Sequence, residues 1–138
     1  MSALDANPFE SSAITTILVV SDLLKSKSFY IDILGAELYR EYSESVVLSF
    51  LDSWILLVLP GGPTEDKPDI HFKTQKDPDN VSHSFTIRVQ NCKKSYEILK
   101  SRGASFLTPP FRRGSETRCF FKDPDGHLFE ISEYRQEG

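Results

Sequence analysis

The residues best suited to chemistry lie in the C-terminal half of the chain. Glu130 alternates with Phe129 and Ile131 in an extended stretch, so its carboxylate is expected on the face opposite these apolar side chains. A carboxylate with apolar neighbours can act as a general base or accept hydrogen bonds from a ligand. The alternative is a salt bridge from Glu130 to Arg88 or Arg118. The sequence leaves both interpretations open.

A second candidate is Arg88, which shares one face of a predicted strand with Ser84 and Thr86. An inward-pointing guanidinium can hold a carboxylate or a phosphate through two parallel hydrogen bonds. Pairing with Glu130 is the simpler expectation, and we favour it.

The histidines form no recognisable metal-binding cluster. His71 lies in a charged loop and His127 in a turn, and neither has a second donor at metal-ligand spacing, so both are expected at the surface. His83 shares its parity with Phe85, in the apolar set expected to pack on a helix, whereas Ser84 faces the other way.

These residues must be positioned by a structure that the sequence repeats once. An apolar strand leads to an N-cap residue, Asp22 in the first copy and Asn91 in the second, and a helix then ends at Gly35 or Gly103. The N-caps are 69 residues apart and the glycines 68, so the second helix is one residue shorter.

Three strands are predicted after each helix, at 36–42, 46–51 and 54–59 and at 104–108, 117–121 and 128–133, with a loop at 109–114. The prediction is an α+β protein of two tandem β-α-β-β-β modules. A single helix covers one face of its sheet, so the two sheets are expected to curl around a central cleft with the helices outside. The predicted segments are a polar arm (1–12), the first module (13–60), a linker loop (61–82), the second module (83–134) and a tail (135–138).

The composition excludes several classes of protein. The formal charge is −4 and the pI is about 5.4, with no basic block, which argues against nucleic-acid binding. The apolar run Ile14–Val20 is shorter than the roughly 20 residues of a spanning helix, and no signal peptide is readable. Cys92 and Cys119 form no disulfide framework, and Cys92 has no partner histidine, so we expect a cytoplasmic protein without a catalytic thiol.

Two stretches of the chain resemble a known family. They are Leu18–Leu23, continuing through Phe29 and Tyr30 to Gly35, and Phe120–Glu130, in which Asp123–Gly126 is the most specific part. The resemblance, from Ile14 to Glu133, is to the vicinal oxygen chelate superfamily, the glyoxalase, bleomycin resistance and extradiol dioxygenase group. It implies a homodimer, with modules paired within one chain or exchanged between two chains.

The resemblance also implies up to four metal-ligand positions, and in this sequence they hold Thr15, Leu57, Ser84 and Glu130. One carboxylate with two hydroxyls and a leucine is a poor ligand set for a transition metal. We therefore predict no metal and no other cofactor, and keep as the alternative a weakly held divalent ion with Glu130 as its sole retained ligand. A one-residue shift that brought in His83 would make two ligands.

The expected cleft is apolar with a few polar anchors, and its inward set includes Ile55 as well as the proposed ligand-binding residues. Trp54 either stacks on a flat ligand or closes the end of the sheet. The residues predicted to bind the ligand are Thr15, Ile17, Trp54, Leu57, Ser84, Thr86, Arg88, Phe120 and Glu130.

Three functions are compatible with this pattern. The leading hypothesis is a metal-free protein that binds a small, partly apolar molecule in the cleft, as the bleomycin resistance type does. The second is a diverged lyase, isomerase or dioxygenase-like enzyme that uses Glu130 as its base. The third is an interaction module whose cleft is filled by its own side chains.

Overall fold

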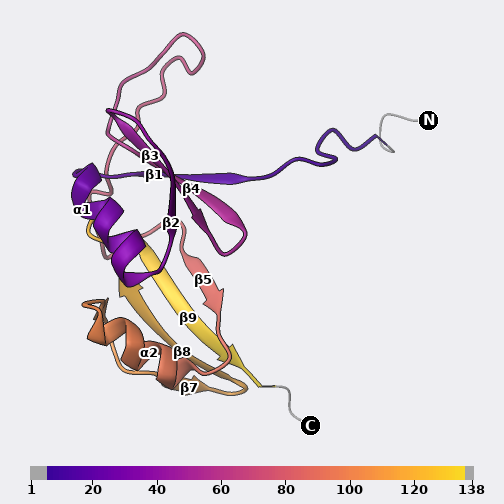
Figure 1. The fold of residues 1–138 in the computed structure, drawn as a ribbon, viewed down its shortest axis with the longest axis vertical. Helices are drawn as coiled ribbons and strands as arrows, with labels where there is room; N and C mark the ends of the chain where they lie inside the picture. Colours follow the sequence, from indigo (N-terminus) through magenta and orange to yellow (C-terminus); the bar gives the residue numbers. More distant parts are fainter. Residues whose placement is uncertain (1–5, 136–138) are drawn as a thin grey trace.

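The computed structural model describes residues 6–135, which form two β-sheets with helices packed against them (Figure 1). The first module has strand order β1-β4-β3-β2, with β1 parallel to β4 and the other pairs antiparallel. Its elements are β1 (Thr15–Val19), α1 (Leu23–Ser28), η2 (Phe29–Ile33), β2 (Glu37–Glu41), β3 (Ser45–Phe50) and β4 (Ser53–Val58).

The second module repeats this topology and adds one short strand. Its order is β5-β9-β8-β6, with β5 parallel to β9 and β7 paired to the end of β8. Its elements are β5 (Phe85–Arg88), α2 (Cys92–Ser101), β6 (Ser105–Phe106), β7 (Phe111–Arg113), β8 (Glu116–Lys122) and β9 (Leu128–Tyr134). The predicted α+β class with two β-α-β-β-β modules is confirmed.

One segment predicted as loop is a strand. Residues 111–113 form β7, an antiparallel hairpin with β8 in which Phe111 pairs with Arg118. The glycine at the hairpin turn, Gly114, has φ 60°, which closes the short connection. Strand pairing satisfies the backbone of this segment and leaves its side chains exposed.

The helix ends follow the sequence signals. The Asp22 side chain accepts a hydrogen bond from the Lys25 amide at 3.0 Å, and Asn91 accepts one from Lys94 at 3.0 Å. Gly35 and Gly103 have φ of 80° and 108°, a conformation that side chains disfavour.

The one-residue difference between the two copies is located in the first helix. α1 continues into η2, a π-helical turn in which the Leu34 amide donates to the Phe29 carbonyl at 3.3 Å. A π turn contains one residue more than an α turn, and α2 has none. The wide turn accommodates the extra residue while both neighbours in it, Phe29 and Tyr30, stay buried.

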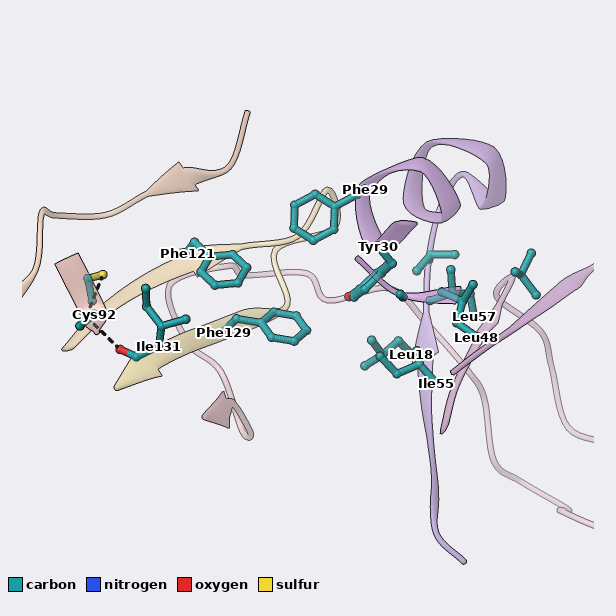
Figure 2. Packing of buried hydrophobic residues seen from close by; sticks show 14 residues of the cluster. Leu18, Phe29, Tyr30, Leu48, Ile55, Leu57, Cys92, Phe121, Phe129 and Ile131 are labelled. Atoms are coloured by element: carbon teal, nitrogen blue, oxygen red, sulfur yellow. Dashed lines mark hydrogen bonds between the residues drawn. The ribbon is translucent and has the colours of Figure 1, made fainter. Parts of the chain in front are cut away.

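A continuous apolar core joins the modules through η2. Phe29 and Tyr30 lie between the apolar residues of the first sheet and those of the second (Figure 2). The Tyr30 ring is 6.0 Å from Phe129 with the planes at 61°, and Phe129 stacks on Phe121 at 5.3 Å. Each sheet therefore turns its helix-covered face toward this shared core.

The turn between β8 and β9 attaches the second module to the first. The Tyr30 hydroxyl donates to the Asp123 carboxylate at 2.7 Å, and the Ser21 amide donates to Asp125 at 3.0 Å. Burial raises the pKa of Asp123, and burial followed by the nearby Asp123 charge raises that of Tyr30.

His127 is not at the surface, and that prediction is wrong. The side chain is 5% exposed, and its Nε2 lies 3.0 Å from the Val19 carbonyl of β1. The Asp123–Gly126 turn directs His127 inward, against the edge strand of the first sheet. The sequence of the turn does not show this, because the contact is with a strand more than 100 residues away.

The linker doubles back on itself between the modules. Gly61 and Phe72 form an isolated antiparallel bridge, and Thr64 and Lys67 form another within the segment between them. Among the residues from 6 to 135, no helix is long and apolar enough to cross a membrane.

Replacing Tyr30 with Phe tests the attachment of the modules. The change keeps the ring but removes the hydroxyl that satisfies the buried Asp123 carboxylate. We expect the free energy of unfolding to fall by about 1–2 kcal/mol, measured by urea denaturation. The matched control is Tyr39→Phe on the exposed face of β2. Equal stability of the two variants would contradict a structural role for the Tyr30–Asp123 bond.

Candidate functional site

In the second sheet, polar side chains gather on the open face, which is the face turned away from α2. Strand alternation separates this face from the apolar residues packed under the helix. In the strand register, Glu130 of β9 stands between Thr86 of β5 and Phe120 of β8. The polar face consists of Thr86, Arg88, Glu116, Arg118, Phe120, Glu130 and Ser132.

Glu130 lies at the centre of this face and is 7% exposed. The Thr86 hydroxyl donates to its Oε1 at 2.7 Å. Within residues 6–135 its Oε2 has only a longer contact, 3.7 Å with Arg118 Nε, and the Arg118 guanidinium lies 5.8 Å from the Phe120 ring centre. One carboxylate oxygen is therefore held firmly, while the other retains capacity to accept a hydrogen bond.

Glu116, which the sequence reasoning missed, forms a second centre on the same face. Its carboxylate receives Arg88 Nη1 at 2.9 Å, Arg118 Nη1 at 3.0 Å and the Ser132 hydroxyl at 2.8 Å. The Ser132 hydrogen bond and then that of Arg88 lower the pKa of Glu116. The sequence feature that could have revealed Glu116 is its spacing of two residues from Arg118, which places both side chains on one face of the same strand.

The favoured pairing of Arg88 with Glu130 is wrong. Arg88 donates to Ser132 at 2.6 Å as well as to Glu116, because Ser132 is its partner in the β5–β9 register. Glu130 stands opposite Thr86, and Arg118 from β8 is the arginine that approaches it. Only the alignment of three strands decides between the two arginines.

The open face of the first sheet is apolar along β1 and β4, while Glu37 of β2 lies on the same face in the row of Ser49 and Trp54. Ile17 and Leu56 are neighbours on it, and Trp54 packs edge-on against Tyr39 with ring centres 4.9 Å apart. Thr15, at the start of β1, is exposed at the rim beside Trp54.

Leu57 and Ile55 lie on the helix-covered face of the first sheet. The expectation that Leu57 lines a cleft is wrong, whereas Ile55 borders the space between the modules. Leu57 pairs with Leu18 and is fully buried on the helix-covered face. The two-residue turn at Leu51 and Asp52, both with positive φ, pairs Phe50 with Ser53 and so sets this register. By the same register, the counterpart of Glu130 in the first sheet is Leu56 rather than Leu57.

The structure does not gather the predicted ligand-binding residues around one hollow. The space between the modules, about 180 Å³, is lined mainly from the helix-covered side by Leu18, Ile55, Phe85 and Ile87. Thr86 reaches it, whereas Arg88 does not line it and has a side chain that is 61% exposed, and Ser84 is exposed just before β5. The two open faces of one chain point away from its shared core.

The donor set does not fit a transition metal. The groups that contact Glu130 are a threonine hydroxyl and an arginine, and a guanidinium repels a cation. Over residues 6–135, no group of three or more His, Cys, Asp and Glu side chains converges as metal ligands would. The residues around Glu130 therefore do not support a metal-dependent mechanism.

The two cysteines are structural. Cys92 and Cys119 are buried between α2 and the second sheet with their sulfur atoms 4.0 Å apart. Burial raises the pKa of Cys92 and raises that of Cys119 to about 12. Thiols in this state are poor nucleophiles at neutral pH.

Replacing Glu116 with Gln tests the polar network through its pH dependence. Because the folded pKa of Glu116 is lowered, its charge stabilises the fold above the ordinary value of 4.5, and this contribution is lost as pH falls. We expect Glu116→Gln to lower the free energy of unfolding by roughly 1 kcal/mol at pH 7. Below pH 4 the difference from the wild type should shrink. Glu37→Gln, on exposed β2, is the control; a pH-independent loss for Glu116→Gln would contradict the assignment.

Comparison with known proteins extends these observations. Residues 13–131 match the family model of the glyoxalase/bleomycin resistance protein/dioxygenase superfamily. The chain is 26% identical over 114 residues to the glutathione transferase FosA of Serratia marcescens, covering 83% of this chain and 74% of that protein. It is 27% identical over 130 residues to the lactoylglutathione lyase of Salmonella typhimurium, covering 89% and 93%.

Solved structures show the same fold. A glyoxalase/bleomycin resistance protein/dioxygenase from Alicyclobacillus acidocaldarius aligns with a TM-score of 0.70 at 21% identity, covering 91% of this chain and 93% of that one. The fosfomycin resistance protein FosX from Listeria monocytogenes aligns with a TM-score of 0.63 at 23% identity, covering 91% and 93%.

Proposed function

Because the chain belongs to the glyoxalase/bleomycin resistance protein/dioxygenase superfamily, we propose that it binds a small, partly apolar molecule on the open face of its second sheet. The observation that carries this proposal is Glu130, a buried carboxylate with one oxygen hydrogen-bonded and the other free to accept. Arg118 supplies a donor beside it, and Phe120 an apolar surface.

A second copy of the chain completes the site in this proposal. The second sheet offers polar anchors, and the first sheet offers an apolar face with Trp54, Leu56 and Ile17, which is 46% exposed. The two faces complement each other, yet within one chain they point apart. A homodimer that sets the first sheet of one copy over the second sheet of the other encloses a ligand between apolar and polar walls.

Binding in this site proceeds without a transition metal. Glu130 accepts a hydrogen bond from a hydroxyl or amine of the ligand, and Arg118 donates a hydrogen bond to an oxygen of the ligand. Closure of the apolar wall excludes water and strengthens both hydrogen bonds.

The test screens the wild-type protein against small amphiphilic molecules by thermal shift and follows hits by calorimetry. For a hit, we expect Glu130→Gln to weaken binding by about tenfold to a hundredfold, as the loss of a charged hydrogen-bond partner does. Trp54→Ala should weaken it as well, through the apolar wall. Glu97→Gln, an exposed position on α2, is the control. Binding unchanged in both site variants would overturn the assignment.

Mixing the two variants distinguishes exchanged modules from a site within one chain. A heterodimer of Glu130→Gln and Trp54→Ala has two composite sites. One contains the wild-type Glu130 of one copy and the wild-type Trp54 of the other, and the second contains both substitutions. We expect co-refolding to restore wild-type affinity in a quarter of all composite sites. No restoration would show that both residues act within a single chain.

Metal content is an independent measurement. Protein purified without chelators is expected to carry well below one equivalent of Zn, Ni, Mn or Fe by elemental analysis, because the site offers one carboxylate. A stoichiometric ion that is lost in Glu130→Gln would overturn the metal-free proposal.

An enzymatic role is the second candidate, favoured by the buried setting of Glu130 beside the Thr86 hydroxyl and by relatives named as a transferase and a lyase. In it Glu130 abstracts a proton from the bound molecule, as a general base. Turnover of a bound molecule by the wild type and by Glu97→Gln, but not by Glu130→Gln, would establish it in place of simple binding.

A further inference from the structure

A second hollow lies away from the polar face, where the linker passes the free edge of β1. It measures about 250 Å³, and three elements enclose it: the edge strand, the last part of the linker and the turn before β9. Its lining residues are Ile17, Leu18, Val19, Lys73, Gln75, Asn80, Ser82, His83 and His127.

The strand edge presents main-chain groups to this hollow. The Val20 amide donates to Val58 of β4 at 2.8 Å, so the peptide groups of Ile17 and Val19 point to the opposite, unpaired edge. The Val19 carbonyl is taken by His127 Nε2 at 3.0 Å. The amides of Ile17 and Val19 remain as donors on the edge that borders the hollow.

His127 is the least exposed polar side chain of this wall. It is 5% exposed, and within the described part of the chain its Nδ1 has no hydrogen-bond partner. Because Nε2–H donates to the Val19 carbonyl, Nδ1 of the neutral ring carries a lone pair, and this buried acceptor calls for a donor such as the hydroxyl of a protonated phosphate. The His83 ring lies beside it, with ring centres 6.0 Å apart.

The remaining wall is polar and its formal charge is positive. Lys73 is its one fixed charge, and no aspartate or glutamate is among the lining residues. Both side-chain amide nitrogens already donate to Asp77, that of Gln75 to the Asp77 carbonyl at 3.1 Å and that of Asn80 to the Asp77 carboxylate. The Ser82 hydroxyl lies 3.4 Å from His83 Nδ1.

We propose that this hollow is a binding site for a small oxyanion, the carboxylate or phosphate group of a metabolite. An ammonium, main-chain amides and a hydroxyl are groups that bind such anions, and no aspartate or glutamate lines the hollow beside them. The hollow shares no residue with the polar face around Glu130 and shares only Ile17 with the apolar wall proposed to close over it, so this proposal does not depend on the function proposed for that face.

The test is a titration of the full chain, followed through the imidazole NMR signals of His83 and His127 at constant pH. Inorganic phosphate is the probe in one arm and acetate in the other. We expect saturable shifts of both histidines in at least one arm, and the stronger arm identifies the anion class. Lys73→Met should weaken binding by about tenfold, the size of one charge-assisted hydrogen bond.

Lys76→Met is the matched control, because Lys76 is an exposed lysine of the same linker that does not line the hollow. It should bind the probe as the wild type does, and circular dichroism melting should show both variants folded. His83→Gln gives an independent check and should weaken binding too. Shifts that never saturate in either arm, or an equal response of Lys73→Met and Lys76→Met, would overturn the proposal.

Discussion

The burial of Tyr30 between the two modules is the interaction on which the rest of the structure depends. Its ring packs on Phe129 of the second sheet, and its hydroxyl satisfies the Asp123 carboxylate in the turn between β8 and β9. The Tyr30 hydroxyl is the partner of Asp123 Oδ2, while the Asp125 and His127 amides donate to Oδ1, so this bond joins the first module to a turn that its own backbone already holds. His127 and Asp125 then reach the first module from the same turn.

Because the helix-covered faces meet inside the chain, the other two faces remain open, and they differ in character. The second sheet carries a network of arginines, glutamates and hydroxyls, whereas the first carries Trp54, Ile17 and Leu56. A small molecule of mixed character would need both walls. The separation of the faces therefore links small-molecule binding to the assembly of two chains in the function proposed above.

The repeat itself was readable, including its one-residue irregularity. The spacing of N-caps and glycines showed that one helix is a residue longer, and the structure places that residue in the π turn next to Tyr30. Alternation also placed Thr86, Arg88, Phe120 and Glu130 on one face of the second sheet. The position that the resemblance implied for Leu57 was wrong, because this side chain is buried on the helix-covered face of the first sheet and the register there depends on the turn at Leu51 and Asp52.

The sequence alone determined the elements, their order, the family and the shortage of metal ligands, because these depend on local periodicity, capping and residue type. The tertiary structure decided which groups meet. Glu116 rather than Glu130 receives Arg88, His127 is buried against β1, and Lys73 and His83 come together beside a strand edge. Those encounters depend on strand register and on how two modules dock, and both result from side-chain contacts between residues far apart in the chain.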